Sequence, residues 1–368
     1  MPKHRVIDAD GHVMETHPDA VQWRDAMGPA YRDRAPRHIP FPTGGGRMFL
    51  EGKIWFEPIP GVDAGVPAEE DNFAVHSTRP GMWDPHVRIE DMDLDGIDQA
   101  VLFGGVLALA ASGLDDGDLA LALCRAYNDW LAGYCAAYPD RLKGMCALPL
   151  QNPEGAAAEL HRGVTELGLV GAHFPTNVHG RDLDDAALDP VYAVAQDLDV
   201  PVCSHGGYLM PGIDNMAGPR SPNQFYLNLY TFPFELMTAM SRFICGGVLD
   251  RFPRLRVGIM EGSVGWLPFW LNRMDSQYEK FGKQVPAKLR PSEYVQSGRV
   301  MVTCDYDETT LPQVVDALGA GNILYASDYW HIDAKFPGTV EYLAGRDDLS
   351  GEAKGRILGE NAAELFKL

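Results

Sequence analysis

Short runs of apolar residues alternate with longer stretches of helical periodicity along the chain after residue 85. Apolar runs of this length are typical of buried parallel strands, and the stretches between them are typical of crossover helices. The alternation therefore predicts an α/β fold with a parallel sheet. Strands are expected at residues 4–10, 99–104, 142–149, 169–175, 200–206, 254–261, 299–305 and 322–328. Eight is the number of strands in a closed (β/α)8 TIM barrel, and we predict that architecture.

Three stretches between the strands have clear helical periodicity, at residues 119–139, 152–167 and 189–198. The second and third begin with a polar residue followed by proline, Asn152 before Pro153 and Asp189 before Pro190. A capping residue followed by proline at the first helical position is a start signal for a helix. We expect Asn152 and Asp189 to be the N-caps of their helices.

Two segments do not follow this rhythm, residues 16–85 and residues 206–233. The first is rich in proline, glycine and aromatic residues. The second directly follows the end of a predicted strand, so we expect a loop that covers the mouth of the barrel. The prediction is one barrel domain over residues 1–368 with these two insertions.

The overall charge of the chain excludes some classes of partner. Its 368 residues contain 31 Lys and Arg against 51 Asp and Glu, a formal charge of −20, without a basic run. Nucleic acid and anionic membrane surfaces are therefore not expected partners. No signal peptide and no apolar stretch of spanning length is found, so a cytoplasmic protein is expected. The six cysteines form no CxxC pair and are expected to be reduced core residues.

Side chains that bind metals follow several of the predicted strands. In barrels of this type the active site lies at the carboxyl ends of the strands. The residues found there are Asp10 and His12, His173, His205, Glu261 and Asp328. Asp10 and His12 are two positions apart, so they point to the same side of an extended segment and can bind one ion together. Imidazoles and carboxylates in combination suit a divalent metal, which predicts a metal site at this rim.

Each of these residues also has a simpler explanation. His173 and His331 fit hydrogen-bonded structural histidines, as most histidines near strand ends are. Glu15 can cap a helix or pair with an arginine, and Glu261 can cap the helix that follows it. Glu15 and His331 remain candidates for catalytic or supporting roles. Neither a G-x-S-x-G elbow nor a glycine-rich phosphate loop is found, so a serine hydrolase and a nucleotide cofactor are not indicated.

Several motifs in order along the chain resemble those of one enzyme superfamily. They are IDADGH (7–12), YPDRLKGMCALPLQNPEGAAAEL (138–160), GLVGAHFPTN (168–177), PVCSHGG (201–207), GWLPFWLNRMD (265–275) and LYASDYWH (324–331). The chain resembles the amidohydrolase superfamily, and within it the family 2 branch of aminocarboxymuconate-semialdehyde and resorcylate decarboxylases. The resemblance implies a distorted (β/α)8 barrel. It also implies that Asp10, His12, His205 and Asp328 are metal ligands.

One position departs from the family pattern, and it sets our first hypothesis. The family usually has a histidine where this sequence has Glu261. A further carboxylate, with His173, would let the barrel hold two iron ions, because such ligand mixtures are found in non-haem di-iron centres. We therefore expect a di-iron monooxygenase that uses O2 to hydroxylate a bulky apolar substrate. The resemblance implies a terpenoid-like substrate in a biosynthetic pathway, because this branch also includes di-iron monooxygenases of terpenoid skeletons.

Aromatic and apolar residues around the expected mouth would suit such a substrate. They are Tyr208, Leu209, Met210, Phe225, Tyr226, Tyr230, Phe232, Trp266 and Trp330. Ordinary packing of a loop explains any single one of them equally well.

Two other functions stay open. The first is a decarboxylase or hydrolase with a single zinc or manganese ion, in which Asp328 moves the proton. The second is a barrel that has lost its chemistry and serves as a binding protein. A homodimer is the expected oligomer, with residues 265–275 as an apolar interface or, alternatively, as a helix that faces the core.

Overall fold

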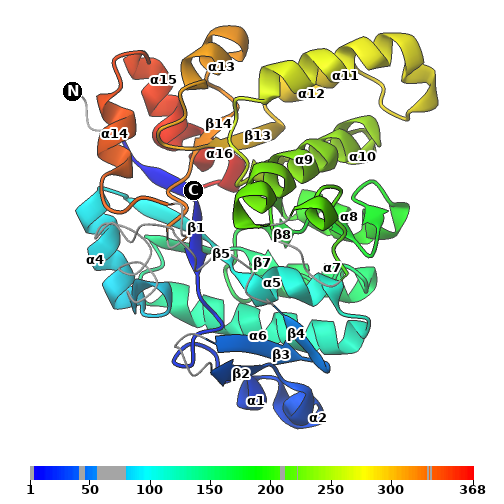
Figure 1. Ribbon diagram of the computed structural model, residues 1–368, viewed down its shortest axis with the longest axis vertical. Helices are drawn as coiled ribbons and strands as arrows, with labels where there is room; N and C mark the ends of the chain where they lie inside the picture. The colour runs from blue at the N-terminus through cyan, green and yellow to red at the C-terminus, as the bar shows by residue number, and fades with distance from the viewer. Residues whose placement is uncertain are drawn as a thin grey trace.

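The fold is a barrel of parallel strands surrounded by helices (Figure 1). The computed structural model describes residues 4–40, 46–55, 80–207, 212–221, 223–329, 331 and 334–368. Among these residues, no helix has both the length and the hydropathy that a membrane crossing needs.

The barrel strands form two hydrogen-bonded sheets in which all pairs are parallel. The first has the order β1 (Ile7–Val13), β5 (Gln99–Gly104), β6 (Leu142–Gly144). The second has the order β14 (Ile323–Tyr325), β13 (Val300–Cys304), β12 (Val257–Met260), β11 (Val202–His205), β8 (Ala172–Phe174), β7 (Cys146–Ala147). Because β6 and β7 are two parts of one predicted strand, all eight predicted strands are confirmed.

The barrel is closed on both sides by contacts outside the regular ladders, as a distorted barrel requires. Between β6 and β7, the N–H of Met145 donates to the carbonyl of Leu102 at 2.9 Å. Beyond the end of β14, the N–H of Asp328 donates to the carbonyl of Asp10 at 3.0 Å. The pairing of β1 with β5 shifts register between Asp8 and Gly11. Such irregularities re-aim side chains, and this one lies beside Asp10.

The helices include the three that periodicity predicted, α6 (Gly117–Ala136), α7 (Pro153–Thr165) and α8 (Asp189–Asp197). Asn152 caps α7 as predicted, because its side chain accepts a hydrogen bond from the N–H of Gly155 at 3.1 Å. The prediction that Asp189 caps α8 is wrong. A 3-10 turn, Ala186–Leu188, leads directly into α8, so Asp189 is already helical and its carboxylate pairs with Arg251 at 3.0 Å.

The other helices of the barrel are mostly short. They are α4 (Pro85–Asp95), α5 (Val106–Ala110), α10 (Val248–Arg251), α11 (Leu267–Phe281), α12 (Pro291–Gln296), α13 (Leu311–Leu318), α14 (Thr339–Gly345), α15 (Gly351–Gly355) and α16 (Asn361–Phe366). Of the predicted interface segment, Leu267, Leu271 and Met274 face the core, whereas Phe269 is 64 % exposed. The homodimer stays a prediction. All six cysteines are free, and the prediction of core residues is confirmed for the five that are buried, whereas Cys245 is half-buried.

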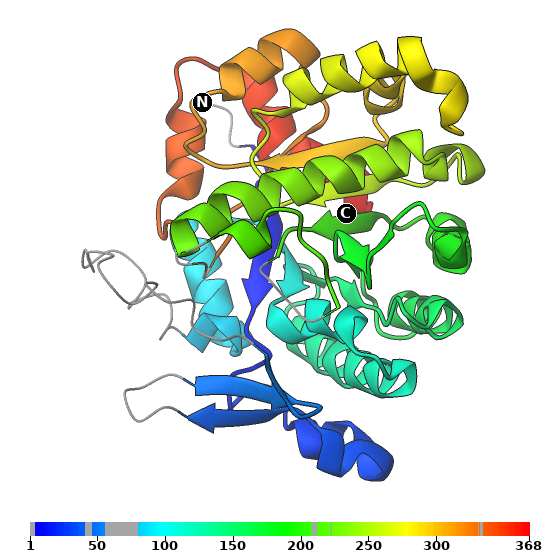
Figure 2. The same cartoon turned by 45° about the vertical axis from the view of Figure 1, so that its right-hand side comes forward.

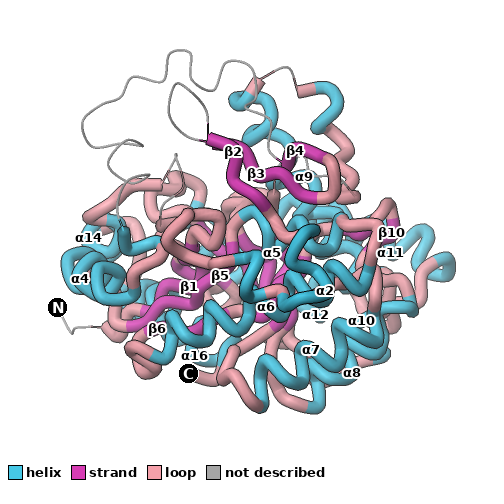
Figure 3. Tube along the Cα trace, turned by 90° about the horizontal axis from the view of Figure 1, so that it is seen from below, coloured by secondary structure: helices cyan, strands magenta, loops and turns pink. Residues whose placement is uncertain are grey.

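The first insertion builds a small sheet of its own outside the barrel (blue in Figure 2). It contains α1 (Trp23–Ala26), α2 (Gly28–Tyr31) and the antiparallel strands β2 (Arg37–Pro40), β3 (Gly46–Leu50) and β4 (Lys53–Trp55). In Figure 3 these three strands lie in a layer of their own, separate from the barrel strands.

The second insertion is not a loop throughout, which corrects the sequence prediction. The helix α9 (Gln224–Cys245) begins within its second half, is 22 residues long and contains Pro233. A Cβ atom on Gly206 would lie 2.3 Å from the ring of Phe232, and one on Gly262 would lie 2.4 Å from Leu236. Because these glycines follow β11 and β12, α9 packs directly on the carboxyl ends of both strands.

A buried arginine ties the carboxyl end of β1 to the segment after β14. Arg88 on α4 donates to the carbonyl of His12 at 2.8 Å, and its guanidinium lies 4.0 Å from the ring centre of Tyr329. Its Nη2 lies 4.0 Å from Asp8, which accepts hydrogen bonds from the N–H and hydroxyl of Ser327. Burial raises the pKa of Asp8 to about 6, since these partners offset only part of the desolvation.

Replacing this arginine should destabilise the protein strongly. Arg88→Met leaves Asp8 buried without a cation and the His12 carbonyl without this donor, so the free energy of unfolding should fall by about 3 kcal/mol at pH 8. A carboxyl group whose pKa is higher in the native than in the unfolded state destabilises the native state as the pH rises from the unfolded to the native pKa. The Arg88→Met substitution should therefore lower the free energy of unfolding less at pH 5 than at pH 8. Urea unfolding at both pH values measures this. The exposed Arg254, paired with Asp197, provides the control Arg254→Met, which should leave the midpoint almost unchanged. Equal midpoints for the two variants would contradict the assignment.

Candidate metal centre

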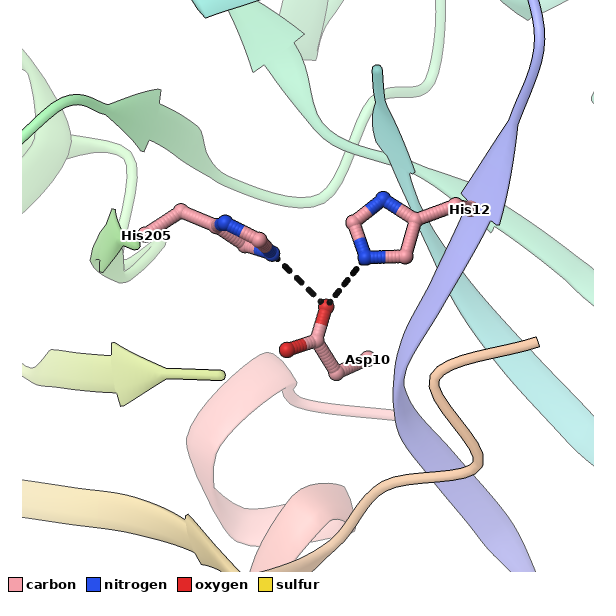
Figure 4. Close-up of side chains that lie close together, drawn as sticks. All are labelled: Asp10, His12 and His205. Carbon is pink, nitrogen blue, oxygen red and sulfur yellow. Dashed lines mark hydrogen bonds and ion pairs between the residues drawn. The ribbon is translucent and has the colours of Figure 1, made fainter. Parts of the chain in front are cut away.

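Three of the predicted ligands meet in the mouth of the barrel (Figure 4). One oxygen of Asp10, Oδ1, lies 3.2 Å from Nε2 of His205 and 3.6 Å from Nε2 of His12. All three side chains are buried. The second oxygen of Asp10, Oδ2, has no hydrogen-bond partner among the described residues. The structure therefore brings together the ligands that the ends of β1 and β11 predicted.

A second group shares His12 with the first and contains Asp328 and His331. Asp328 Oδ1 lies 3.3 Å from Nε2 of His12 and 2.6 Å from Nδ1 of His331. The Asp328 side chain is 24 % exposed, whereas that of Asp10 is 1 % exposed. Asp328 also has a φ of +49°, a strained conformation for a residue with a side chain. Of the two aspartates, Asp328 is therefore the more exposed.

The charges of this cluster favour a cation between its members. Burial opposes the protonation of His205, but the carboxylates of Asp10 and Glu261 outweigh it and raise its pKa to about 9. For His331, burial is likewise outweighed by Asp328 and Glu261, and its pKa is raised well above the usual value. His12 behaves in the opposite way, because burial and the charge of His331 lower its pKa well below the usual value. Buried carboxylates facing imidazole nitrogens at these distances fit a divalent ion such as zinc or manganese.

His173 lies beside this cluster and belongs to neither group of potential ligands. Its ring is 5.3 Å from that of His205 and 5.1 Å from that of Phe103, measured between centres. Neither of its nitrogens has a hydrogen-bond partner among the described residues, and burial lowers its pKa well below the usual value. Its role as a metal ligand stays a prediction.

Glu261 contacts two imidazoles of the cluster. Its Oε2 lies 3.1 Å from Nδ1 of His205, and its Oε1 lies 2.8 Å from Nδ1 of His331. Burial raises the pKa of Glu261 to about 7, although both histidines oppose the shift. Glu261 is in neither group of side chains that could share one ion, and direct ligation of a metal by Glu261 stays a prediction.

Glu15 matches the simpler of its two explanations. Its carboxylate is buried and accepts hydrogen bonds from the N–H groups of Gly105 and Leu107 at 2.9 and 2.7 Å. These residues stand at the start of α5, so Glu15 satisfies backbone donors of that helix.

Part of the predicted aromatic lining is exposed. Phe225 and Tyr226 are 69 % and 38 % exposed on α9, and Tyr226 packs against Tyr230 at 5.9 Å between ring centres. Substrate binding by these three residues stays a prediction. Trp266 is partly buried and donates to the carbonyl of Gly262. Tyr208, Leu209, Met210 and Trp330 lie outside the described residues.

A small cavity beside the cluster identifies lining residues that the sequence reasoning missed. It is lined by Leu109, Pro175, Thr176, His205, Gly207, Ile213 and Asn215. Pro175 and Thr176 directly follow β8, so the rule that places the site at strand ends could have found them. Leu109 lies on α5 and Ile213 and Asn215 in the second insertion, where no pattern in the sequence marks them.

Comparisons with known proteins agree with the geometry. The sequence pattern of the amidohydrolase family matches residues 7–368. The chain is 31 % identical over 291 residues to a 2-amino-3-carboxymuconate-6-semialdehyde decarboxylase of Dictyostelium discoideum, covering 78 % of this chain and 77 % of that protein. It is 28 % identical over 343 residues to a gamma-resorcylate decarboxylase of a Polaromonas species, covering 88 % and 99 %.

Solved structures show the same fold. A 5-carboxyvanillate decarboxylase of Novosphingobium aromaticivorans with bound manganese has a TM-score of 0.72 at 24 % identity, covering 99 % of this chain and 97 % of that one. An amidohydrolase of Mycobacterium avium subsp. paratuberculosis has a TM-score of 0.78 at 20 % identity, covering 100 % and 99 %.

These relatives contradict the expected oxidoreductase. The two curated relatives described above are decarboxylases, and the decarboxylase structure of similar fold contains manganese. The di-iron monooxygenase was inferred from the additional carboxylate of Glu261, which the structure places against two imidazoles. Neither two iron ions nor monooxygenase chemistry is supported.

Proposed function

We propose that this chain, which belongs to the amidohydrolase family, is a decarboxylase that depends on one divalent metal ion and needs no oxidant. Its proposed substrates are aromatic or other unsaturated carboxylic acids, the class to which the substrates named for its decarboxylase relatives belong. The sequence left both decarboxylation and hydrolysis open, and of these two reactions we propose decarboxylation.

One observation carries the proposal, the closed cluster of Asp10, His12 and His205 beside the more open carboxylate of Asp328. The buried members provide a negative charge and two imidazoles for a cation. The open member provides a carboxyl group that can exchange protons with a substrate in the mouth of the barrel. A decarboxylase needs both parts, because it must stabilise charge on the substrate and deliver a proton to carbon.

The metal would be held by Asp10, His12, His205 and Asp328. When bound, a divalent ion supplies a Lewis acid that stabilises negative charge on the oxygens of the substrate. Zinc or manganese both fit this mixture of carboxylates and imidazoles.

Residues of this chain would deliver the proton to the substrate. Decarboxylation breaks the bond between the carboxylate carbon and the substrate carbon that carries it, releases CO2 and forms a C–H bond at the carbon that carried the carboxylate. No electrons are gained or lost, so neither an oxidant nor a reductant is required. Asp328 would transfer its carboxyl proton to that carbon, and His331, whose Nδ1 lies 2.6 Å from Oδ1 of Asp328, would hold this carboxyl in place.

Metal depletion and reconstitution test this function. The chelator-treated protein should be inactive, and one equivalent of Mn2+ or Zn2+ should restore CO2 release from at least one member of a panel of hydroxylated benzoic acids and unsaturated dicarboxylic acids. Headspace CO2 and chromatography of the product measure the reaction. Full activity of the metal-free protein, or no CO2 release from any of these acids with either metal, would contradict the proposal.

A further inference from the structure

We propose that Glu261 is a positioning residue that accepts hydrogen bonds from Nδ1 of both His205 and His331 and so orients the two rings, with Nε2 of His205 turned toward the metal site. The inference rests on the metal centre of the proposed function and adds to it a role for a side chain outside the ligand groups. It is carried by the hydrogen-bonding atoms that surround the two imidazoles.

The first of these imidazoles, His205, has two oxygens next to its Nδ1. The carbonyl of Gly206 lies at 2.7 Å and Oε2 of Glu261 at 3.1 Å. A carbonyl and a carboxylate can only accept hydrogen bonds, so Nδ1 must carry a proton. Nε2, the atom that lies 3.2 Å from Asp10, is then the nitrogen left for a metal ion, which displaces any proton that it carries. A carboxylate behind a ligating histidine is a usual way to hold the ring in this orientation.

The same argument applies to the second imidazole, His331. Its Nδ1 lies 2.8 Å from Oε1 of Glu261 and 2.6 Å from Oδ1 of Asp328. Two carboxylate oxygens again face one nitrogen, which must therefore donate. Each oxygen of Glu261 thus accepts from a different imidazole. One side chain thereby orients a proposed metal ligand and the histidine that holds Asp328.

The backbone of Glu261 is shaped for this placement. Its φ is +57°, which costs a residue with a side chain about 1 kcal/mol. Its N–H donates to the hydroxyl of Thr303 at 2.8 Å, which holds the conformation in place. Strain of this kind, held by the surrounding structure, is found preferentially at functional sites.

Capping of the next helix does not explain Glu261. The residue before α11 is Trp266, and no side-chain hydrogen bond caps this helix at that position. The N–H groups of Val264 and Gly265, in the segment leading to α11, donate instead to Glu308. Glu308 therefore supports the same loop, and it offers a matched control.

Glu261→Gln tests the inference without changing the size of the side chain. An amide has one accepting oxygen and one donating nitrogen, so it cannot accept from both imidazoles. We expect the affinity for Mn2+, measured by competition with a chelator, to fall 10- to 100-fold. In the Zn2+-loaded protein, 1H–15N NMR of the histidine rings should detect hydrogen-bonded Nδ1–H groups of His205 and His331 in the wild type, and a shifted or lost Nδ1–H signal for at least one of them in the variant. Glu308→Gln should change neither the affinity nor these signals.

Two results would overturn the inference. One is a variant that binds Mn2+ as tightly as the wild type. The other is a loss of affinity with both Nδ1–H signals unchanged, which would make Glu261 a direct ligand. Both readouts are independent of turnover, so they can fail while CO2 release is observed, and they can succeed if the reaction proves to be a different one.

Discussion

Asp328→Asn should lower kcat for CO2 release about a thousandfold. An amide cannot supply the carboxyl proton that replaces CO2 on the substrate, and a positioned general acid contributes about 10²- to 10⁴-fold. The amide oxygen keeps the shape of the side chain and a lone pair for a metal, so the variant should still take up the ion when Mn2+ is supplied in excess. Steady-state kinetics on the metal-loaded variant, with metal analysis of the same sample, measures both quantities.

A neighbouring carboxylate provides the control for this prediction. Asp305 follows β13, accepts a hydrogen bond from the hydroxyl of Ser263 and belongs to neither ligand group. Asp305→Asn should change kcat by less than about threefold. A metal-loaded Asp328→Asn protein with more than a tenth of the wild-type kcat would remove Asp328 from the chemistry.

Asp10→Asn should lower the affinity for Mn2+ about a thousandfold. Asp10 is buried, and its Oδ1 faces both His12 and His205. Two unit charges about 4 Å apart at an effective dielectric constant of 20 interact by about 4 kcal/mol, so a carboxylate and a divalent ion interact by about 8 kcal/mol. Half of this larger energy corresponds to about three powers of ten in the dissociation constant. Titration against a chelating indicator measures it.

An Asp→Asn substitution two residues earlier, at Asp8, distinguishes the loss of charge at the metal site from a general disruption of β1. Asp8 is also buried, and Asn at this position can still accept from the N–H of Ser327. Asp8→Asn should weaken Mn2+ binding by less than about fivefold. Equal effects of the two substitutions would show that Asp10 acts through the fold of β1 and does not contact the ion.

The strands and the main cluster could be predicted because the relevant information is local. Each strand is a short apolar run, and the residue after it has a known place at the rim of a barrel. Asp10, His12 and Asp328 follow from this rule, and His205 from its place as the last residue of β11.

Elements that depend on tertiary contacts could not be read from the sequence. Pro233 argues against a helix, yet α9 continues through it because Phe232 and Leu236 pack on the strand ends. The exposure of Phe225 and Tyr226 follows from the orientation of this helix, and periodicity alone does not reveal which face is covered. Asp189 is displaced from its capping role by a 3-10 turn that local signals do not mark.

The error about function has a similar physical origin. A glutamate at a strand end can ligate a metal or accept hydrogen bonds from imidazoles, and the amino-acid sequence is the same in both cases. The partners decide, and His205 and His331 come to Glu261 from other strands and loops. Counting carboxylates along the chain therefore gave no sound basis for a second metal ion.

Deuterium incorporation tests the central claim most directly. The metal-loaded protein should convert a carboxylic acid substrate in D2O under anaerobic conditions, with one CO2 released for each product molecule. Mass spectrometry and NMR should find one deuterium at the carbon that carried the carboxylate, since Asp328 exchanges its proton with solvent and transfers it to that carbon. Turnover that requires O2, or a product that retains its carboxylate, would contradict the account.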